Sequence, residues 1–314
     1  MGQEGDPRKT LGIALPTCGN PHPSALGAWY PSPMAKAVVA LESALLTHGL
    51  PYPLNLRTAM ALEEAVRAEG ALPKTIALVR GEVRLGLSQE EMEALAQGGA
   101  EKASLWNLPA LLAQGRSAGT TVAATVHLAH RHGIAVFATG GIGGVHPEPF
   151  DESADLLALA RTPILVVCSG PKAILDLRAT LERLETLGVS VVGYRTDRLP
   201  AFFSPSSPFP VPARVETPLE AALVLRKSQE LGLGAVLLVN PVSQGLPYEK
   251  VALWVEEANH QAAREGIFGK ALTPYLLRRL SELSRGETDR VNERLLLENA
   301  RLAARVALAL AGLE

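Results

Sequence analysis

From residue 36 onward, short apolar runs alternate with longer stretches in which apolar residues recur at helical spacing. The apolar runs predict strands at 36–42, 75–87, 134–141, 163–170, 189–197 and 234–240. The helical patterns cover 57–70, 88–97, 119–133, 153–161, 171–188, 217–231, 248–265 and 271–313. Strands that alternate with helices are typical of an α/β protein. We therefore predict a mostly parallel central sheet with helices on both faces, in a single domain.

Two segments modify this simple alternation. Residues 75–87 contain two apolar runs around Arg80-Gly81-Glu82, which predicts a hairpin. Residues 1–35 are rich in Pro and Gly and show no clear period, so we interpret them as an irregular N-terminal arm. No internal repeat or linker divides residues 36–314, which we expect to form one domain.

Unusual residues follow several of the predicted strands. Glu42 ends the first strand, a glycine loop follows another, and Ser169-Gly170 and Asn240 end two more. In parallel sheets the ligand crevice lies beyond the carboxyl ends of the strands. The pattern therefore predicts that these segments converge on one site.

Composition and charge narrow the classes of function. Of 314 residues, 47% are hydrophobic and 20% charged, and the net charge of −2 comes from both signs spread along the chain. Without a basic stripe, a nucleic acid polymer is not an expected partner, whereas a small anionic ligand needs only a local site. Cys18 and Cys168 give no disulfide framework, which predicts a cytoplasmic protein. The polar start and the lack of an 18-residue apolar run predict neither a signal peptide nor a membrane span.

The glycine loop TGGIGGVH runs from Thr139 to His146. Its glycines allow tight turns and bring backbone amides close to a ligand. The loop does not match the dinucleotide pattern G-x-G-x-x-G, because position 146 is His. The alternative is a flexible turn between a strand and a helix. Residues 119–125, GTTVAAT, offer a helix N-terminus suited to phosphate, or simply an ordinary capped helix.

The sequence FDESAD places Asp151 and Asp155 four residues apart around the helix cap Ser153. On a helix this spacing puts both carboxylates on one face, where Mg²⁺ or Mn²⁺ would relieve their repulsion. The alternative is acidic residues that favour the helix N-terminus through its dipole.

Lys172 is the strongest candidate for chemistry. The chain has 8 lysines and 22 arginines, so a surface cation is normally arginine here. Lys172 lies in SGPKAILD, after a predicted strand and at the predicted start of a helix. The helix dipole disfavours an ammonium there, which would suit an amine nucleophile. A lysine facing solvent at the helix edge is the alternative.

Within residues 36–310 the chain contains, in this order, the segments ALESALLTHGLPYPLN, GTTVAATVHLAHRHGIAVFATGGIGGVH, FDESADLLALARTPILVVCSGPKAILD, GYRTDRLPAFF, GKALTPYLLRRLSEL and ENARLAARVA. Together and in this order, these long segments resemble the pseudouridine-5'-phosphate glycosidase family, which includes proteins linked to indigoidine biosynthesis. The resemblance implies that residues 36–314 form a catalytic domain with an α/β/α fold, usually a homotrimer. Its reaction would be reversible cleavage of pseudouridine 5'-phosphate into uracil and ribose 5-phosphate, with one Mn²⁺ per subunit.

The same resemblance implies roles for particular residues. Lys172 would be the nucleophile, forming a Schiff base, and Glu42 the proton donor. Asp151 would hold the metal, mostly through waters. The residues implied to contact substrate are Lys102, Val122, Ser153, Ala154, Asp155, His146 and Asn299.

Two departures from the family pattern affect these roles. The loop HPEPFD after His146 is shorter than usual, and Pro171 stands before the lysine, where a small residue is common. Proline is compatible with a first helical turn, so the role of Lys172 is retained. The competing interpretations are a related lyase or glycosidase acting on another C-nucleoside or sugar phosphate, and a non-catalytic oligomeric binding protein.

Overall fold

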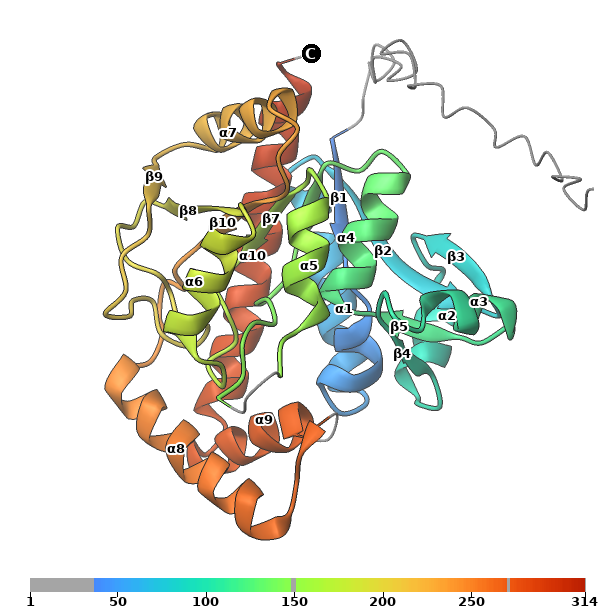
Figure 1. The fold of residues 1–314 in the computed structure, drawn as a ribbon. Helices are drawn as coiled ribbons and strands as arrows, with labels where there is room; N and C mark the ends of the chain where they lie inside the picture. The colour runs from blue at the N-terminus through green and yellow to red at the C-terminus, as the bar shows by residue number, and fades with distance from the viewer. Residues whose placement is uncertain (1–36, 148–150, 270–271, 314) are drawn as a thin grey trace, which may run out of the picture. The chain divides into compact units, whose positions relative to one another are not determined.

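The computed structural model describes residues 37–147, 151–269 and 272–313 (Figure 1). The predicted arm, residues 1–35, lies outside the described residues. The described part contains one ten-stranded sheet with helices on both faces, which confirms the predicted fold class.

Most neighbouring strands of the sheet are parallel. The strands are β1 (Val38–Leu41), β2 (Leu72–Val79), β3 (Glu82–Leu85), β4 (Glu101–Ala103), β5 (Ala118–Thr120), β6 (Val136–Ala138), β7 (Leu165–Cys168), β8 (Ser190–Tyr194), β9 (Ala213–Val215) and β10 (Val236–Val239). Their order is β4-β5-β2-β1-β6-β7-β10-β8-β9, with β3 also paired to β2. Only the β2–β3 and β2–β5 pairs among these strands are antiparallel. The carboxyl ends of β1, β6, β7 and β10 therefore lie at one edge of the sheet.

The helices that cover the sheet form two layers (Figure 1). They are α1 (Leu54–Ala68), α2 (Gln89–Ala96), α3 (Leu108–Ala113), α4 (Val122–Arg131), α5 (Ala154–Arg161), α6 (Leu177–Thr186), α7 (Pro218–Glu230), α8 (Tyr248–Glu265), α9 (Leu272–Leu283) and α10 (Glu287–Ala311), with a π-helical turn, η2, at Leu45–Gly49. Helices α1, α7 and α10 pack on one face of the sheet, and α4, α5 and α6 on the other.

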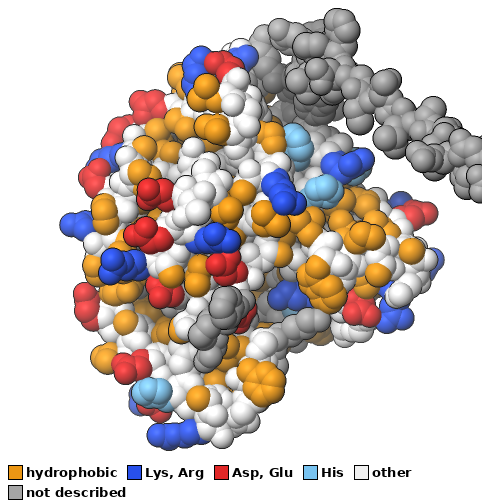
Figure 2. Space-filling view, in the orientation of Figure 1, with side chains coloured by type: hydrophobic (Ala, Val, Ile, Leu, Met, Phe, Trp, Pro, Cys, Tyr) orange, Lys and Arg blue, Asp and Glu red, His pale blue; other side chains and the backbone are white. Residues whose placement is uncertain are grey.

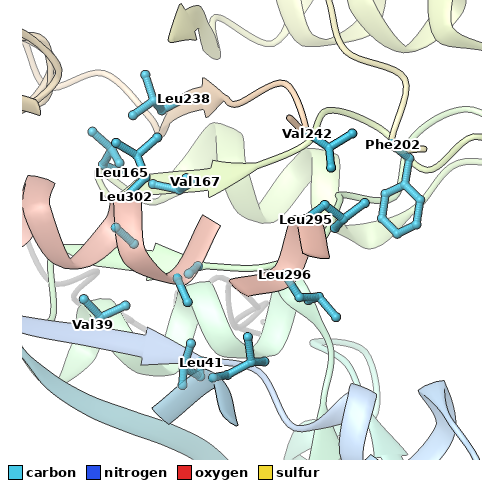
Figure 3. Packing of buried hydrophobic residues seen from close by; sticks show 14 of the residues in the cluster. Val39, Leu41, Leu165, Val167, Phe202, Leu238, Val242, Leu295, Leu296 and Leu302 are labelled. Atoms are coloured by element: carbon cyan, nitrogen blue, oxygen red, sulfur yellow. The ribbon is translucent and has the colours of Figure 1, made fainter. Parts of the chain in front are cut away.

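Alternate residues of each central strand enter the two cores. Val39 and Leu41 of β1 face the α10 side, whereas Ala40 between them faces the α4 side. Figure 3 shows part of the first core, where side chains of β1, β7 and β10 meet Leu295, Leu296 and Leu302 of α10. Because both faces are covered, the central strands β1, β6, β7 and β10 are apolar at every position, as predicted for a parallel sheet.

Local sequence explains where several helices begin. Ser88 accepts a hydrogen bond from the amide of Glu91, whose carboxylate accepts one from the Ser88 amide, which completes a capping box before α2. Thr121, Ser153 and Thr217 cap α4, α5 and α7 in the same way through a side-chain oxygen. The predicted cap at Ser88 and the start of the helix at Ser153 are confirmed.

The hairpin at 75–87 is also confirmed. β2 and β3 are antiparallel and are joined at Arg80 and Gly81, with φ of +51° and +78° respectively. Both values lie in the left-handed region that a two-residue hairpin turn requires.

Three predicted boundaries were wrong. Residues 119–133 are not one helix, because Gly119 and Thr120 extend strand β5 and Thr121 caps α4. The helix predicted over 171–188 begins only at Leu177, after the cap Asp176. The helical tail, 271–313, is two helices, with Arg285 and Gly286 between them at φ of +53° and +79°.

No helix among the described residues is both long and apolar enough to cross a membrane. Figure 2 shows acidic and basic side chains mixed over one face of the described part, in agreement with the mixed signs in the sequence.

Candidate active site

Glu42 lies just beyond the end of β1, at the carboxyl edge of the sheet. The hydroxyl of Thr139, just beyond β6, donates a hydrogen bond to its carboxylate. Burial raises the pKa of Glu42 above its usual value, against the opposing effects of the Lys172 charge and the Thr139 hydrogen bond. Glu42 can therefore keep or recover a proton more readily than an exposed carboxyl.

Lys172 lies in a loop after β7 rather than at the start of a helix. Its position comes from the neighbouring glycine loop, through backbone hydrogen bonds that continue the parallel β6–β7 pairing. Ser169 donates to the Gly140 carbonyl (2.8 Å), Ile142 to the Gly170 carbonyl (3.2 Å), and Lys172 to the Ile142 carbonyl (3.0 Å). The argument from the helix dipole was wrong, because α6 starts five residues later. Pro171 is likewise outside a first helical turn.

Lys102 belongs to strand β4, not to the loop suggested by the sequence. Desolvation lowers the pKa of Lys102, and the charge of Lys172 lowers it further, while Glu42 and Asp155 act in the opposite direction. Lys102, Lys172, Glu42 and Asp155 therefore lie close enough for their charges to influence one another. The structure thus collects the two lysines and the glutamate that the sequence singled out.

The glycines of the loop allow close packing rather than unusual backbone angles. A side chain on Gly143 would collide with Ser153, and one on Gly144 with Thr180. The Gly143 amide donates to the carboxylate of Asp155 at 2.8 Å. This amide already has a protein partner, unlike the free amides expected from the sequence.

Asp155 holds two segments together. One carboxylate oxygen accepts from the Gly143 amide, and the other accepts from the Ala123 amide at the start of α4, at 2.9 Å. Asp151 precedes α5, so the prediction that Asp151 and Asp155 share one helical face was wrong. Whether Asp155 also contacts substrate stays a prediction.

The other residues predicted to bind substrate lie around this junction. Val122 is the first residue of α4, with a buried side chain, and Ala154 is the first residue of α5. The Ser153 hydroxyl accepts from the Asp155 amide at 3.2 Å. Because Ala123 and Ala124 at the start of α4 already donate to side chains, the α4 N-terminus has fewer free amides than the sequence suggests.

Asp151 and His146 are neighbours across a short loop. The His146 amide donates to the Asp151 carbonyl at 2.9 Å, and His146 Nδ1 is buried without a hydrogen-bond partner among the described residues. Desolvation lowers the pKa of His146, although the charge of Asp151 raises it. No group of three His, Cys, Asp or Glu side chains in the described part could form a metal cage. A partly exposed Asp151 carboxylate fits a hard cation that keeps most of its waters.

Asn299, from within α10, joins three strand ends. Its side-chain amide donates to the Thr139 carbonyl at 2.9 Å, and its side-chain oxygen accepts from Asn240 at 3.0 Å. It also bonds to the Ser169 hydroxyl at 3.1 Å. Asn299 is fully buried, so the structure gives it a role in fixing the strand ends. Its contact with substrate stays a prediction.

Thr139 is a residue of the candidate site whose contact with Glu42 the sequence did not predict. It was noted as the start of the glycine loop, but its bond to Glu42 depends on β1 and β6 being neighbours. No signal within either segment reveals this contact.

The arrangement offers two lysine side chains and a carboxyl of raised pKa at one edge of the sheet. The thiol of Cys168 is not a comparable nucleophile, because burial raises its pKa to about 12. The site is therefore suited to imine chemistry on a carbonyl compound, supported by proton transfer.

The chain matches the family model described as indigoidine synthase A like protein over residues 33–309. A relative from Thermus thermophilus, named pseudouridine-5'-phosphate glycosidase, is 86% identical over 281 residues, covering 90% of this chain and 100% of the relative. A relative of the same name from Petrotoga mobilis is 48% identical, covering 87% of this chain and 91% of its own.

Two solved structures share the fold. An indigoidine synthase A-like protein from Thermotoga maritima has a TM-score of 0.82 and 36% identity, covering 87% of this chain and 93% of its own. The prealnumycin C-glycosynthase AlnA, solved with ribulose 5-phosphate, has a TM-score of 0.82 and 40% identity, covering 88% of this chain and 92% of its own. The chain belongs to the indigoidine synthase A-like family.

Proposed function

We propose that this protein cleaves the C–C glycosidic bond of pseudouridine 5'-phosphate reversibly, giving uracil and ribose 5-phosphate. The observation that carries the proposal is the cluster of Lys172, Glu42 and Lys102 at the carboxyl edge of the sheet. The name shared by relatives with 86% and 48% identity supports the choice of substrate.

The bond to be broken explains why an amine is needed. A C–C bond to uracil has no heteroatom leaving group, so direct hydrolysis through an oxocarbenium ion is unfavourable. Opening of the ribose ring breaks the bond between the anomeric carbon and the ring oxygen, and the Lys172 amine adds at the anomeric carbon to give a covalent amine. The uracil carbon then takes up a proton, and the nitrogen lone pair forms an iminium as the C–C bond breaks with its electrons remaining on uracil. Water adds to the remaining imine and releases ribose 5-phosphate and the free amine.

Glu42 supplies the proton transfers of this sequence. Its raised pKa favours a protonated carboxyl that can donate to the ring oxygen as the sugar opens. The Thr139 hydroxyl fixes one carboxylate oxygen and leaves the other for substrate. Lys102 would contact the sugar from the same cluster, where desolvation and the Lys172 charge lower its pKa.

We propose that Asp151 holds one Mn²⁺ per subunit through its carboxylate and waters, with His146 beside it. When bound, the cation would neutralise charge on the sugar phosphate. Ser153, Ala154 and Asp155 lie next to Asp151 in the chain, and we assign them to the same phosphate-binding region. From the family resemblance, we further propose that the protein is a homotrimer and acts in the cytoplasm.

The test is incubation of purified protein with pseudouridine 5'-phosphate and Mn²⁺, with uracil and ribose 5-phosphate measured. Borohydride added with ribose 5-phosphate should trap an adduct on Lys172, located by mass spectrometry. Lys172→Arg should lose both the adduct and cleavage, because a guanidinium stays protonated. The control is Lys227→Arg, since Lys227 pairs with Glu230 on the exposed surface of α7. Normal turnover by Lys172→Arg would exclude the covalent mechanism.

Metal dependence is tested in the same assay. A chelator should abolish uracil release, and added Mn²⁺ should restore it. Asp151→Asn should raise the Mn²⁺ concentration needed for half-maximal activity. Full activity of metal-free protein would exclude the assignment to Asp151.

The second candidate function is C-glycoside formation or cleavage with another aromatic aglycone. The similarity to AlnA, a C-glycosynthase solved with a pentulose phosphate, favours this candidate. Uracil release from pseudouridine 5'-phosphate at a rate far below that from another C-glycosyl phosphate would support it over the first.

A further inference from the structure

The loop that carries Lys172 is enclosed on two sides. On one side it pairs with the glycine loop through the Ser169 and Lys172 amides. On the other side lies the segment 200–204, where the Phe202 amide donates to the Ser169 carbonyl at 2.9 Å. A side chain on Gly170, whose φ is +82°, would collide with the Pro200 carbonyl. The segment 200–204 therefore acts as a second wall for the loop.

Phe202 adopts an unfavourable backbone conformation in this wall. Its φ is +58°, a left-handed value that bulky side chains rarely accept. Such residues persist where the surroundings hold them, and they are frequent at functional sites. The Phe202 side chain is buried, and its amide donates to the Ser169 carbonyl, so both its side chain and its backbone are fixed.

The ring of Phe202 occupies space that two glycines leave open. An added Cβ on Gly141 would lie 2.5 Å from the ring, and one on Gly140 would lie 3.3 Å from it. The same Gly141 position is 2.9 Å from the Gly170 carbonyl. Figure 3 shows Phe202 at the margin of the core beside Leu295, which also approaches Gly140. The ring therefore packs against the backbone of the glycine loop, which pairs with the Lys172 loop.

We propose that Phe202 is a positioning residue for Lys172. It fixes the Lys172 loop from one side through its amide, and fixes the glycine loop through its ring. This inference rests on the proposed function, because it concerns the alignment of the Lys172 amine with the sugar. A small displacement of a reacting group lowers the rate of the chemical step more than it lowers binding.

The experiment compares Phe202→Leu with a matched control, Phe203→Leu. Phe203 is equally buried and meets Phe202 edge to face at 4.7 Å between ring centroids. The carbonyl of Phe203 accepts from Leu246, and its ring is not among the nearest contacts of Gly140 or Gly141. Both variants remove a buried ring, but only Phe202→Leu removes the contact with the glycine loop.

For Phe202→Leu we expect kcat to fall by about 10- to 100-fold with KM nearly unchanged, and borohydride trapping on Lys172 to slow by the same factor. Phe203→Leu should lower the melting temperature to a similar extent while its kcat stays within about threefold of wild type. If Phe202→Leu does not fold, Phe202→Met, which refills most of the space, is measured with the same expectations.

Equal losses of kcat in the two variants, or normal trapping by the Phe202 variant, would overturn the inference and leave the proposed function intact. Failure of the wild type to form any adduct on Lys172 would overturn the covalent step of the proposed function, and this inference with it. The wild-type trapping result therefore separates the two failures.

Discussion

At the scale of single residues, three polar side chains of the site are held by protein partners before any substrate binds. Thr139 holds Glu42, two amides hold Asp155, and three side chains or carbonyls hold Asn299. Fixed orientations reduce the reorganisation needed during reaction.

Replacing Glu42 by Gln should separate catalysis from stability. The amide cannot donate and recover a proton, so kcat should fall by about 10²–10⁴-fold. Because folding raises the pKa of Glu42, wild-type stability declines as the pH rises from the unfolded-state pKa through the folded-state pKa. Glu42→Gln lacks this decline. Its melting temperature should exceed that of wild type at neutral pH and converge with it near about pH 4.

The two expected results for Glu42→Gln can be contradicted independently. Turnover within about twofold of wild type would make Glu42 a structural residue. A melting temperature below that of wild type at neutral pH would show that burial is not the main cost of the ionised carboxyl.

Removing the Thr139 hydroxyl should change the pH dependence of activity. The hydroxyl stabilises the ionised form of Glu42, so Thr139→Val should raise the pKa of Glu42 further. The limb of the kcat/KM profile that reports Glu42 should then move to higher pH. Thr139→Ser keeps the donor and is the control. Coincident profiles for the Val and Ser variants would contradict the role of this hydrogen bond.

At the scale of elements, the sequence pattern predicted most of the central strands and helices. It placed Lys172 at the start of a helix, however, whereas this residue lies in a loop. Pro171 fits a helix start, and only the pairing with the glycine loop shows that residues 171–176 remain irregular. A boundary decided by contacts from another strand is not visible in a local pattern. The division of 119–133 has the same cause, since Gly119 joins β5 by pairing with β4 and β2.

The junction of the glycine loop with α5 should be intolerant of added volume. In Gly143→Ala the new methyl group would collide with Ser153 and lie 2.9 Å from the Asp155 carboxylate. We expect the loop to shift, with kcat/KM lower by at least about tenfold and reduced thermal stability. Gly312→Ala is the control, because its nearest neighbours would be 3.6 Å away. Equal kinetics for the two variants would show that the junction adapts.

At the scale of the whole molecule, the parallel α/β class followed from the alternation of patterns, but the strand order did not. The sheet runs β4-β5-β2-β1-β6-β7-β10-β8-β9, and β5 joins it antiparallel to β2. Strands β4 and β5 have three residues each, too few to carry a distinct apolar pattern. The convergence of Glu42 with Lys172 could be anticipated because both follow strand ends. The contact of Thr139 with Glu42 could be predicted only from the strand order, in which β1 and β6 are neighbours.

The predicted assembly is open to a direct measurement. A homotrimer should have three times the 33.2 kDa mass of one chain by light scattering coupled to size exclusion. The mass should persist on dilution to assay concentrations, as expected for a stable oligomer. A constant mass of one or two chains would contradict the trimer.

The position of Asn299 has a consequence for how the protein is made. Chains fold from the N-terminus as they leave the ribosome, and α10 is translated after every strand of the sheet. The nascent chain therefore carries Glu42, Thr139 and Lys172 before the helix that fastens the carboxyl edge exists. We expect an arrested chain that ends before α10 to contain the reactive groups without being able to use them. Activity should then begin only after Asn299 has been synthesised and α10 has packed against the strand ends, so that this helix controls when the nascent protein becomes an enzyme.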